Sequence, residues 1–505
     1  MSPFAEGSSW SRSSGSPRAW RLGIAALLLA APTVLAFFSG GYFGVSHGQV
    51  GVLVSALAWV LVALVLVLEP APLPPTRAGR VALAALVALT AWTALSLLWS
   101  PLRDPGLADV ERTALYCAAF VVGVAVLRGI AITRVIEPAL LLGISVVCGY
   151  ALATRLLPGI VDSAPGFQAG SRLDQPLTYW NALGALSAMG LVLAVHTAAD
   201  ARRAARLRLA GAALVPPLGL VLFLTVSRGA HAAAAAGIVV LLLMARDRRA
   251  VAASVIGVAL VALTAGITAR FHGVVELQGS TATREHEALA VLALTLVLSG
   301  AAAAAQALLM RLERRDEAWT RTLRKRPALA AMAGAAALVC LALGVSAFAG
   351  GSVSASPDQK GPERFRTIET NRWRYWRVAL DSFAEQPLTG SGVHGFAADW
   401  LERRDIDEAV QDAHSLYVET LTELGLPGLL LLLTFLGGAG IALLRAGEPG
   451  WAAAAAVWAV HAGVDWDWEM PALTLVFIAL AAAASATAAR TQSAGSAANR
   501  SRVTP

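Results

Sequence analysis

Long apolar runs, repeated along almost the whole chain, are the feature that most restricts how this sequence can fold. Runs of about 17 to 25 residues are long enough to cross a hydrocarbon layer of roughly 30 Å as helices, at about 1.5 Å per residue. Only 14% of the residues are charged and 57% are hydrophobic, whereas about a quarter of the residues of a typical soluble protein are charged. The sequence therefore predicts an all-α polytopic membrane protein.

We expect about fourteen membrane spans (12 to 14), with both termini on the same side. They are placed at 22–38, 50–68, 80–98, 113–128, 134–151, 181–198, 209–226, 229–244, 251–268, 287–309, 328–348, 416–444, 451–466 and 470–489. The alternative for the first run is a signal peptide, because Val34-Leu35-Ala36 is similar to a cleavage site.

This scheme divides the chain into five parts. Residues 1–21 form a disordered cytoplasmic N-terminus, and 22–348 hold spans 1 to 11. Residues 349–415 form one large extracytoplasmic loop with short helices. Spans 12 to 14 occupy 416–489, and a disordered cytoplasmic tail follows at 490–505.

The distribution of Lys and Arg predicts the orientation. An N-terminus in the cytoplasm places 25 of the 40 Lys and Arg residues inside and 15 outside, 8 of these in the long 349–415 loop. Long loops cross the membrane largely regardless of charge, so the comparison among short loops is 25 against 7. The net charge of +7 is thus a topology signal rather than a sign of nucleic-acid binding, and the 349–415 loop is expected outside the cytoplasmic membrane.

The polar stretch from Asn371 to Gly428 is the expected location of function. As a helix, Arg372–Glu385 gathers Trp373, Trp376, Leu380 and Phe383 on one face, with Arg372 at its shoulder and Arg374 on the opposite, solvated face. One interpretation is an interfacial amphipathic helix with tryptophans at headgroup depth. The other makes Arg372 an inward guanidinium that grips phosphate with its planar fork.

Other groups in this stretch allow both a structural and a functional interpretation. Gly390 and Gly392 indicate a turn without a P-loop context. His414, at the boundary of span 416–444, is either a capping residue or a catalytic base. No zinc site is expected, because His394 and His414 are far apart in the sequence. The three cysteines (Cys117, Cys148 and Cys340) lie in apolar runs and imply no disulfide framework or metal cluster.

The ordered motifs of this region resemble the carboxy-terminal module of the O-antigen ligase and polymerase superfamily. They are Arg372-x-x-x-Trp376-x-x-Ala379-Leu380, Pro387-x-x-Gly390-x-Gly392-x-x-x-Phe396, Ala413-His414-Ser415-x-Tyr417 and Glu423-x-Gly425-x-x-Gly428, with Ser227-Arg228-Gly229 and His461-x-x-x-Asp465-Trp466-Asp467 elsewhere. One departure is Ser415, where the family commonly has Asn after the histidine. This puts an amide contact in doubt, but not the histidine.

The resemblance implies a metal-independent membrane glycosyltransferase without a cofactor. It would move a glycan en bloc from undecaprenyl diphosphate to a hydroxyl of a glycan, lipid or protein acceptor at the outer face. Arg372 and Arg228 match the arginines of the family and would bind the diphosphate, and Arg172 is a further candidate for this role. The alternative interpretation of Arg228 is an interfacial arginine that snorkels to the membrane surface. His414 would be the catalytic base, and the possible supporting residues are Trp376, Gly390, Gly392, Tyr417, His461 and Asp465.

Three expectations about these residues and their function remain open at this point. We expect His461 and Asp465, one helical turn apart, to form a structural pair. A ligase and a chain-elongating polymerase differ in the acceptor, which the sequence does not display. The rival from another class, a transporter of a lipid-linked glycan, predicts charged residues in the middle of spans, whereas the spans here are nearly free of charge.

Overall fold

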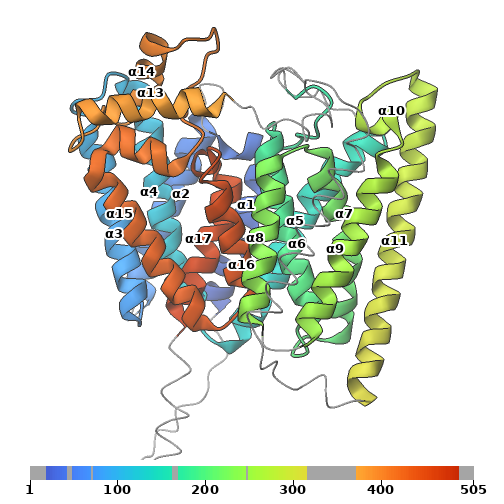
Figure 1. Ribbon diagram of the computed structural model, residues 1–505. Coiled ribbons are helices and arrows are strands. Elements are labelled where there is room, and N and C mark those ends of the chain that lie inside the picture. Colours follow the sequence, from blue (N-terminus) through green and yellow to red (C-terminus); the bar gives the residue numbers. More distant parts are fainter. Residues whose placement is uncertain are drawn as a thin grey trace, which may run out of the picture.

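The computed structural model describes residues 19–42, 48–69, 72–161, 169–245, 248–315 and 371–487, and this part of the chain forms a helical bundle without strands (Figure 1). The first helices are α1 (Ala19–Ala36), α2 (Gly48–Leu68), α3 (Arg77–Ser96), α4 (Arg103–Val126), α5 (Ile130–Leu156), α6 (Trp180–Ala199) and α7 (Ala205–Leu224). The remaining ones are α8 (Arg228–Met244), α9 (Arg248–Thr268), α10 (His272–Val275), α11 (Thr281–Arg315), α13 (Arg372–Glu385), α14 (Gly395–Arg403), α15 (Leu416–Ala446), α16 (Pro449–His461) and α17 (Pro471–Ala486), with short 3₁₀ turns η1 (Ser39–Gly41) and η4 (Asp467–Glu469).

The predicted all-α fold is confirmed for the described residues. Every predicted span falls on a helix except 328–348, which lies outside the described residues, as do 349–370. Within the described part, 8 helices are long and apolar enough to cross a membrane, and the shorter apolar segments are Leu53–Leu68 of α2, α8 and α17. The number of spans, twelve to fourteen, stays a prediction.

Two helices, α6 and α17, form the centre of the bundle. Every residue of α6 from Asn181 to Ala199 and every residue of α17 is buried. Small side chains let neighbouring backbones approach closely, as is common between membrane helices. At Gly211 of α7, for example, a Cβ would lie 2.8 Å from the carbonyl oxygen of Ala194 in α6. The tight packing therefore depends on Gly and Ala in the sequence.

Polar contacts join the connections between helices to one another at each end of the bundle. At one end, ion pairs join Arg202 to Glu448 at 2.6 Å and Arg208 to Glu313 at 2.7 Å. At the other end, where α10 and α13 lie (Figure 1), the hydroxyl of Tyr42 donates to Gln411 at 3.0 Å. Connections that alternate along the chain thus meet at opposite ends, as expected if successive helices run antiparallel.

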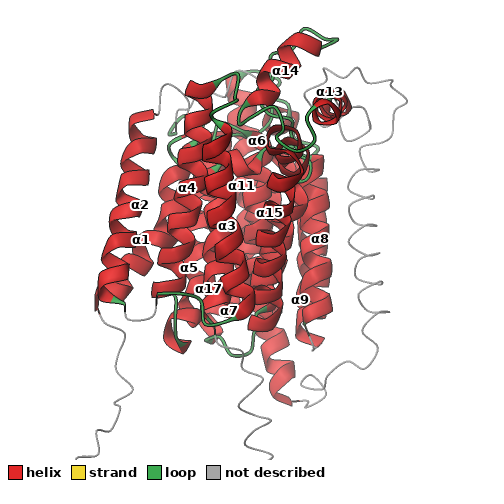
Figure 2. Cartoon of the chain, turned by 90° about the vertical axis from the view of Figure 1, so that its left-hand side faces the viewer, coloured by secondary structure: helices red, strands yellow, loops and turns green. Residues whose placement is uncertain are grey.

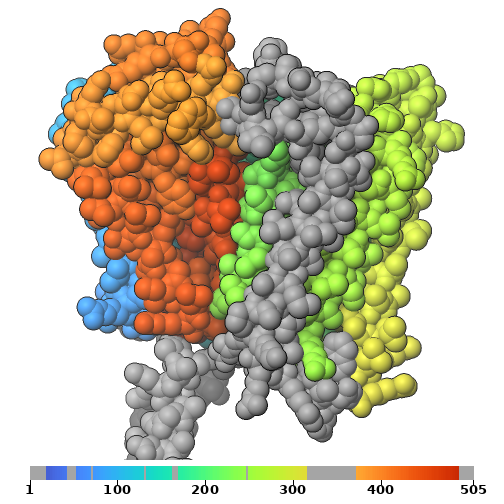
Figure 3. Space-filling view, in the orientation of Figure 1, coloured from blue at the N-terminus to red at the C-terminus, as the bar shows by residue number. Residues whose placement is uncertain are grey.

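Two helices outside the bundle, α13 and α14, cover one of these ends. α13 runs across the bundle axis and is seen almost end-on after a 90° turn (Figure 2). The space-filling view shows residues of this region, in orange, above the red helices (Figure 3). The described part of 349–415 therefore contains two short helices, at the end of the bundle that also carries Tyr42.

The face that α13 buries differs from the apolar face that the sequence suggests. Tyr375, Val378, Ala379 and Ser382 are the buried residues, and the Thr422 hydroxyl of α15 donates to the Ala379 carbonyl at 3.0 Å. Trp373 is 60% exposed and Leu380 is 42% exposed. These apolar side chains point away from the bundle, which is the arrangement that an interfacial helix requires.

Candidate functional site

Arg372, the first residue of α13, points back toward the bundle and forms an ion pair with Asp465. The Asp465 side chain is fully buried, whereas 22% of the Arg372 side chain is exposed. The pair therefore joins the covering helix to the connection between α16 and α17. Arg372 uses one of its terminal nitrogens for this pair, and a guanidinium carries five N–H donors in a planar fork. The inward interpretation of Arg372 agrees with this geometry.

Several other groups hold the Asp465 carboxylate in place. The Tyr179 hydroxyl donates to it at 2.6 Å and the Trp466 backbone N–H at 3.0 Å. The Asn181 amide in turn donates to the Tyr179 oxygen at 2.8 Å. Burial alone would raise the pKa of Asp465, but the Arg372 guanidinium, together with nearby His414, holds that pKa below its ordinary value. Asp465 is therefore a fixed anion that orients Arg372.

The expected pair between His461 and Asp465 is wrong. The Nδ1 atom of His461 lies 2.7 Å from an oxygen of Asp467 instead. The helix α16 ends at His461, so Asp465 does not occupy the next helical turn and is free to face Arg372. The His461–Asp467 pair is fully buried, as a structural contact would be, although its partner differs from the predicted one.

His414 has a geometry that suits a base. Its φ of 56° is left-handed, which is uncommon for a non-glycine residue and is often found at functional sites. Its Nδ1 atom lies 2.9 Å from the carbonyl oxygen of Asp412, and because a carbonyl only accepts, Nδ1 carries the proton. Nε2 is then the basic nitrogen, and no hydrogen bond to it is formed within the described residues.

The surroundings of His414 favour its neutral form. Burial lowers the pKa of the imidazole and Arg372 adds to this effect, whereas Asp465 opposes it. The net direction is downward, so the ring is unprotonated at neutral pH. The ring centroid lies 5.2 Å from that of Tyr375 and 6.5 Å from that of Trp466. His414 is thus held by aromatic rings next to the Arg372–Asp465 pair.

The predicted supporting residues Trp376 and Tyr417 tie neighbouring elements together. The Trp376 indole N–H donates to the Ala413 carbonyl at 3.1 Å, which links α13 to the residue before His414. The Tyr417 hydroxyl donates to the Ala459 carbonyl at 2.9 Å, which links α15 to α16. Ser415 caps α15, its hydroxyl accepting from the Val418 N–H at 3.4 Å. These three contacts hold the elements on either side of His414 together.

The predicted glycines Gly390 and Gly392 permit close backbone packing. Gly390 has φ of 64°, and a Cβ there would lie 2.4 Å from the carbonyl group of Glu423. A Cβ on Gly392 would lie 2.6 Å from Cα of Ser100. The N–H groups of Ser391 and Gly392 donate to the carbonyls of Thr422 and Glu423 at 3.0 and 2.9 Å. This turn is therefore docked on α15, and the glycines have a structural role.

Arg172 and Arg228 lie at the same end of the bundle as Arg372. The Arg172 side chain is buried, its Nε donates to the Ala169 carbonyl at 2.9 Å, and its guanidinium lies 3.5 Å from the centroid of the Trp180 ring. That ring is 5.0 Å from Tyr179, the partner of Asp465. Trp180, Tyr179 and Asp465 therefore connect Arg172 to Arg372.

Arg228 opens α8 next to His461. Ser227 caps this helix, its hydroxyl accepting from the Ala230 N–H at 3.3 Å. A Cβ at the following residue, Gly229, would lie 3.3 Å from the His461 ring. The start of α8 is therefore packed against the end of α16, close to Asp465. The side chain of Arg228 is half-buried.

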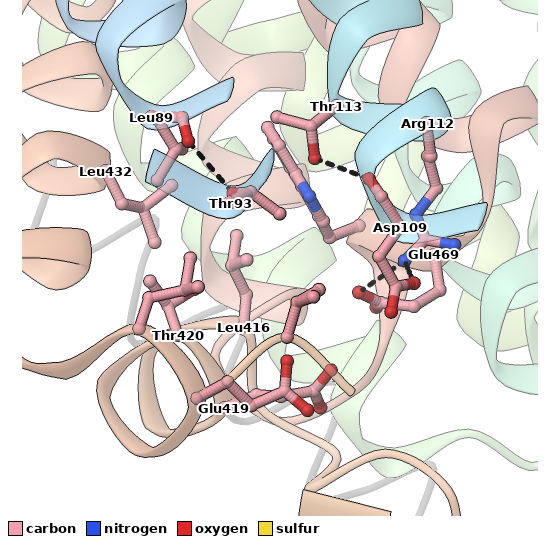
Figure 4. A pocket seen from close by; sticks show the side chains of 14 residues that line it. Leu89, Thr93, Asp109, Arg112, Thr113, Leu416, Glu419, Thr420, Leu432 and Glu469 are labelled. Carbon is pink, nitrogen blue, oxygen red and sulfur yellow. Dashed lines mark hydrogen bonds and ion pairs between the residues drawn. The ribbon is translucent and has the colours of Figure 1, made fainter. Parts of the chain in front are cut away.

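A second group of charged residues, next to this site, was not expected from the sequence. Asp109 forms an ion pair with Arg112 and lies 3.0 Å from Nδ1 of His394. Burial alone would lower the pKa of His394, but Asp109 raises it to about 9. The group also contains Asp412, Glu419, Glu423 and Glu469, and Figure 4 shows part of it around a cavity.

Only a weak signal in the sequence indicates this acidic group. Its members come from α4, from the connection before α15, from α15 itself and from η4, so no local spacing unites them. The signal is that carboxyl groups occur next to apolar runs, such as Glu419 and Glu423, which lie one helical turn apart near the start of a predicted span. In the described part of the chain, Asp412, Glu419 and Glu469 are close enough to share a metal ion, and no histidine joins them.

The comparison with protein families gives one match. Residues 287–433 match the family described as O-antigen ligase. This stretch contains most of α11, all of α13 and α14, and the first part of α15, including Arg372 and His414. No curated protein matches the chain.

Proposed function

We propose that this chain, which belongs to the O-antigen ligase superfamily, transfers a glycan from undecaprenyl diphosphate to an acceptor hydroxyl at the outer face of the cytoplasmic membrane. The observation that carries the proposal is the position of His414 beside the Arg372–Asp465 pair. A neutral base and an oriented guanidinium are the two groups that such a transfer needs. Membership in the superfamily and the apolar helices support a membrane protein.

The reaction forms one glycosidic bond and breaks one bond to phosphate-bound oxygen. The acceptor oxygen attacks the anomeric carbon of the glycan, and its proton passes to Nε2 of His414. The bond between this carbon and the diphosphate oxygen breaks, and its electron pair leaves with the lipid diphosphate. A positioned base of this kind contributes roughly 10² to 10⁴ in rate.

The leaving diphosphate accumulates negative charge, which fixed donors can stabilise more in the transition state than in the ground state. Arg372 is held by the Asp465 carboxylate through one terminal nitrogen, so other N–H donors of its fork remain for phosphate oxygens. Arg228 and Arg172 would add positive charge from the neighbouring elements. In this proposal the arginines neutralise the diphosphate, and no metal contacts it.

Transfer by the purified protein tests the proposal against its rival, a transporter. The chain is mixed in detergent micelles with its lipid-linked glycan and with the acceptor fraction of the same cells, and the products are separated by size. An enzyme forms a new glycosidic bond and releases lipid diphosphate in micelles, where no membrane separates two sides. If glycan stays on the lipid with every acceptor fraction, the proposal is wrong.

The same assay separates a ligase from a polymerase. A ligase joins the glycan to a lipid or protein acceptor, whereas a polymerase lengthens the lipid-linked glycan itself. In cells, deletion of the gene provides the matching test. Accumulation of lipid-linked polymer with loss of attached polymer indicates a ligase, and single repeat units in place of polymer indicate a polymerase.

A further inference from the structure

The acidic group beside His414 carries more negative charge than its own cations can balance. Asp109, Asp412, Glu419, Glu423 and Glu469 contribute five carboxyl groups. Their neighbouring cations are Arg112 and His394, and Asp109 pairs with both of them. Charges removed from water must be paired, protonated or bound to metal, since an unpaired buried charge is costly.

Three of these carboxyl groups meet in a geometry suited to one ion. Asp412 precedes α15, Glu419 lies in its first turn and Glu469 ends η4, and one oxygen of each lies within 4.8 Å of the other two. Oxygen ligands lie about 2.3 to 2.6 Å from Ca²⁺, so two of them on opposite sides are up to roughly 5 Å apart, against about 4.2 Å for Mg²⁺. A separation of no more than 4.8 Å is compatible with a calcium-sized ion between the three oxygens.

An unused oxygen on Glu469 is the second observation that indicates a ligand. Glu469 is 4% exposed, and its Oε2 has no hydrogen-bond partner within the described residues. Its other oxygen, Oε1, lies 3.6 Å from Arg112. A buried carboxylate oxygen without a partner is unusual, because buried polar groups are normally satisfied. Arg112 therefore occupies one side of this carboxylate and leaves the other side open.

A cavity beside two of the three carboxyl groups has room for an ion and water. Glu419 and Glu469 line a cavity of about 40 Å³, with Asp109 and Arg112 on its wall (Figure 4). One water needs about 10 to 15 Å³ on this measure, so the cavity can hold an ion with part of its hydration shell.

We propose that Asp412, Glu419 and Glu469 bind one divalent cation of calcium size. The ligand set contains oxygen only, which is the preference of hard cations such as Ca²⁺ rather than of Zn²⁺. The ion would neutralise the carboxylates that no cation of the described residues pairs with. It lies apart from the diphosphate, whose charge the arginines neutralise in the proposed function.

The bound ion fixes the segment that presents His414. The Asp412 carbonyl accepts from Nδ1 of His414 at 2.9 Å, and Glu419 accepts from the Ala413 N–H at 2.7 Å. Two of the three ligands therefore touch the backbone or ring of residues 412–414. This positioning role rests on the proposed function, whereas binding of the ion does not.

Equilibrium dialysis of the full-length protein in detergent with radioactive Ca²⁺ tests the site. The wild type is expected to bind about one Ca²⁺ per chain, and Glu469→Gln is expected to lose this binding. Glu423→Gln is the matched control, because it removes the same charge from the same cavity but leaves the three ligands intact. It should still bind Ca²⁺.

Thermal unfolding provides a readout that does not depend on transfer activity. A ligand that binds only the folded state stabilises it by mass action, so Ca²⁺ should raise the unfolding temperature of the wild type and of Glu423→Gln, but not that of Glu469→Gln. A wild type that binds no Ca²⁺ would show that protons alone balance the cluster. Equal loss of binding in both variants would exclude a specific site at the three carboxyl groups. A protein that binds Ca²⁺ but transfers no glycan would contradict the proposed function and not the ion site.

Discussion

At the scale of single residues, His414 is distinguished by a protonated Nδ1, a basic Nε2 and a lowered pKa. His414→Ala should reduce the rate of transfer by about 10² or more, with normal binding of donor lipid. His414→Gln keeps hydrogen bonding without basicity, so it should be similarly slow. The transfer rate should fall with decreasing pH only below the ordinary titration range of histidine, because the pKa of His414 is lowered and the base must be unprotonated to act. A Gln variant at near wild-type rate would make His414 an orienting residue.

Arg372 provides the second prediction at this scale. Arg372→Lys keeps the charge but loses the planar fork that can hold Asp465 and a phosphate oxygen together. Transfer by purified protein should fall by about 10², the loss expected for a donor that stabilises transition-state charge. Arg374→Ala is the matched control, because Arg374 is 43% exposed and pairs with exposed Asp405 on the other side of α13. Equal losses in both variants would show that orientation toward Asp465 does not matter.

At the scale of elements, the docking of the 386–392 turn on α15 depends on Gly390. A Cβ there would meet the Glu423 carbonyl at 2.4 Å, with φ of 64° as additional strain. Gly390→Ala should therefore lower the unfolding temperature and reduce transfer. Gly440→Ala is the control: Gly440 lies within α15, a Cβ there would have nothing within 4 Å, and the change should be neutral or stabilise the helix by about 0.5 to 1 kcal/mol. Thermal unfolding of the two variants measures the difference, and equal effects would contradict this role of Gly390.

The elements also show how far sequence reasoning reaches. Apolar runs predict helices because membrane length and helical rise are fixed quantities, and the described helices agree with them. Motif order identified Arg372 and His414, which the structure places together. The partner of Asp465 was not predictable, because it depends on where α16 ends. The partners of Glu469 lie 50 or more residues away in sequence, so no local spacing could reveal them.

At the scale of the whole molecule, the candidate site forms where distant connections meet. Tyr179 precedes α6, His414 precedes α15 and Asp465 follows α16, yet Arg372 and its partners bring them together at one end. A site built this way is held by the packing of the helices that these connections join.

The orientation of this end is the last prediction, and it follows from the 25-to-7 excess of Lys and Arg in short loops on the other side. Asp407, with a 99% exposed side chain, belongs to the end that carries His414, and exposed Arg315 ends α11 at the opposite end. In a background without Cys117, Cys148 and Cys340, single Asp407→Cys and Arg315→Cys variants are treated with a membrane-impermeant thiol reagent. Asp407→Cys should react in intact cells, and Arg315→Cys only after permeabilisation. The reverse pattern would place His414 in the cytoplasm and contradict both the topology and transfer at the outer face.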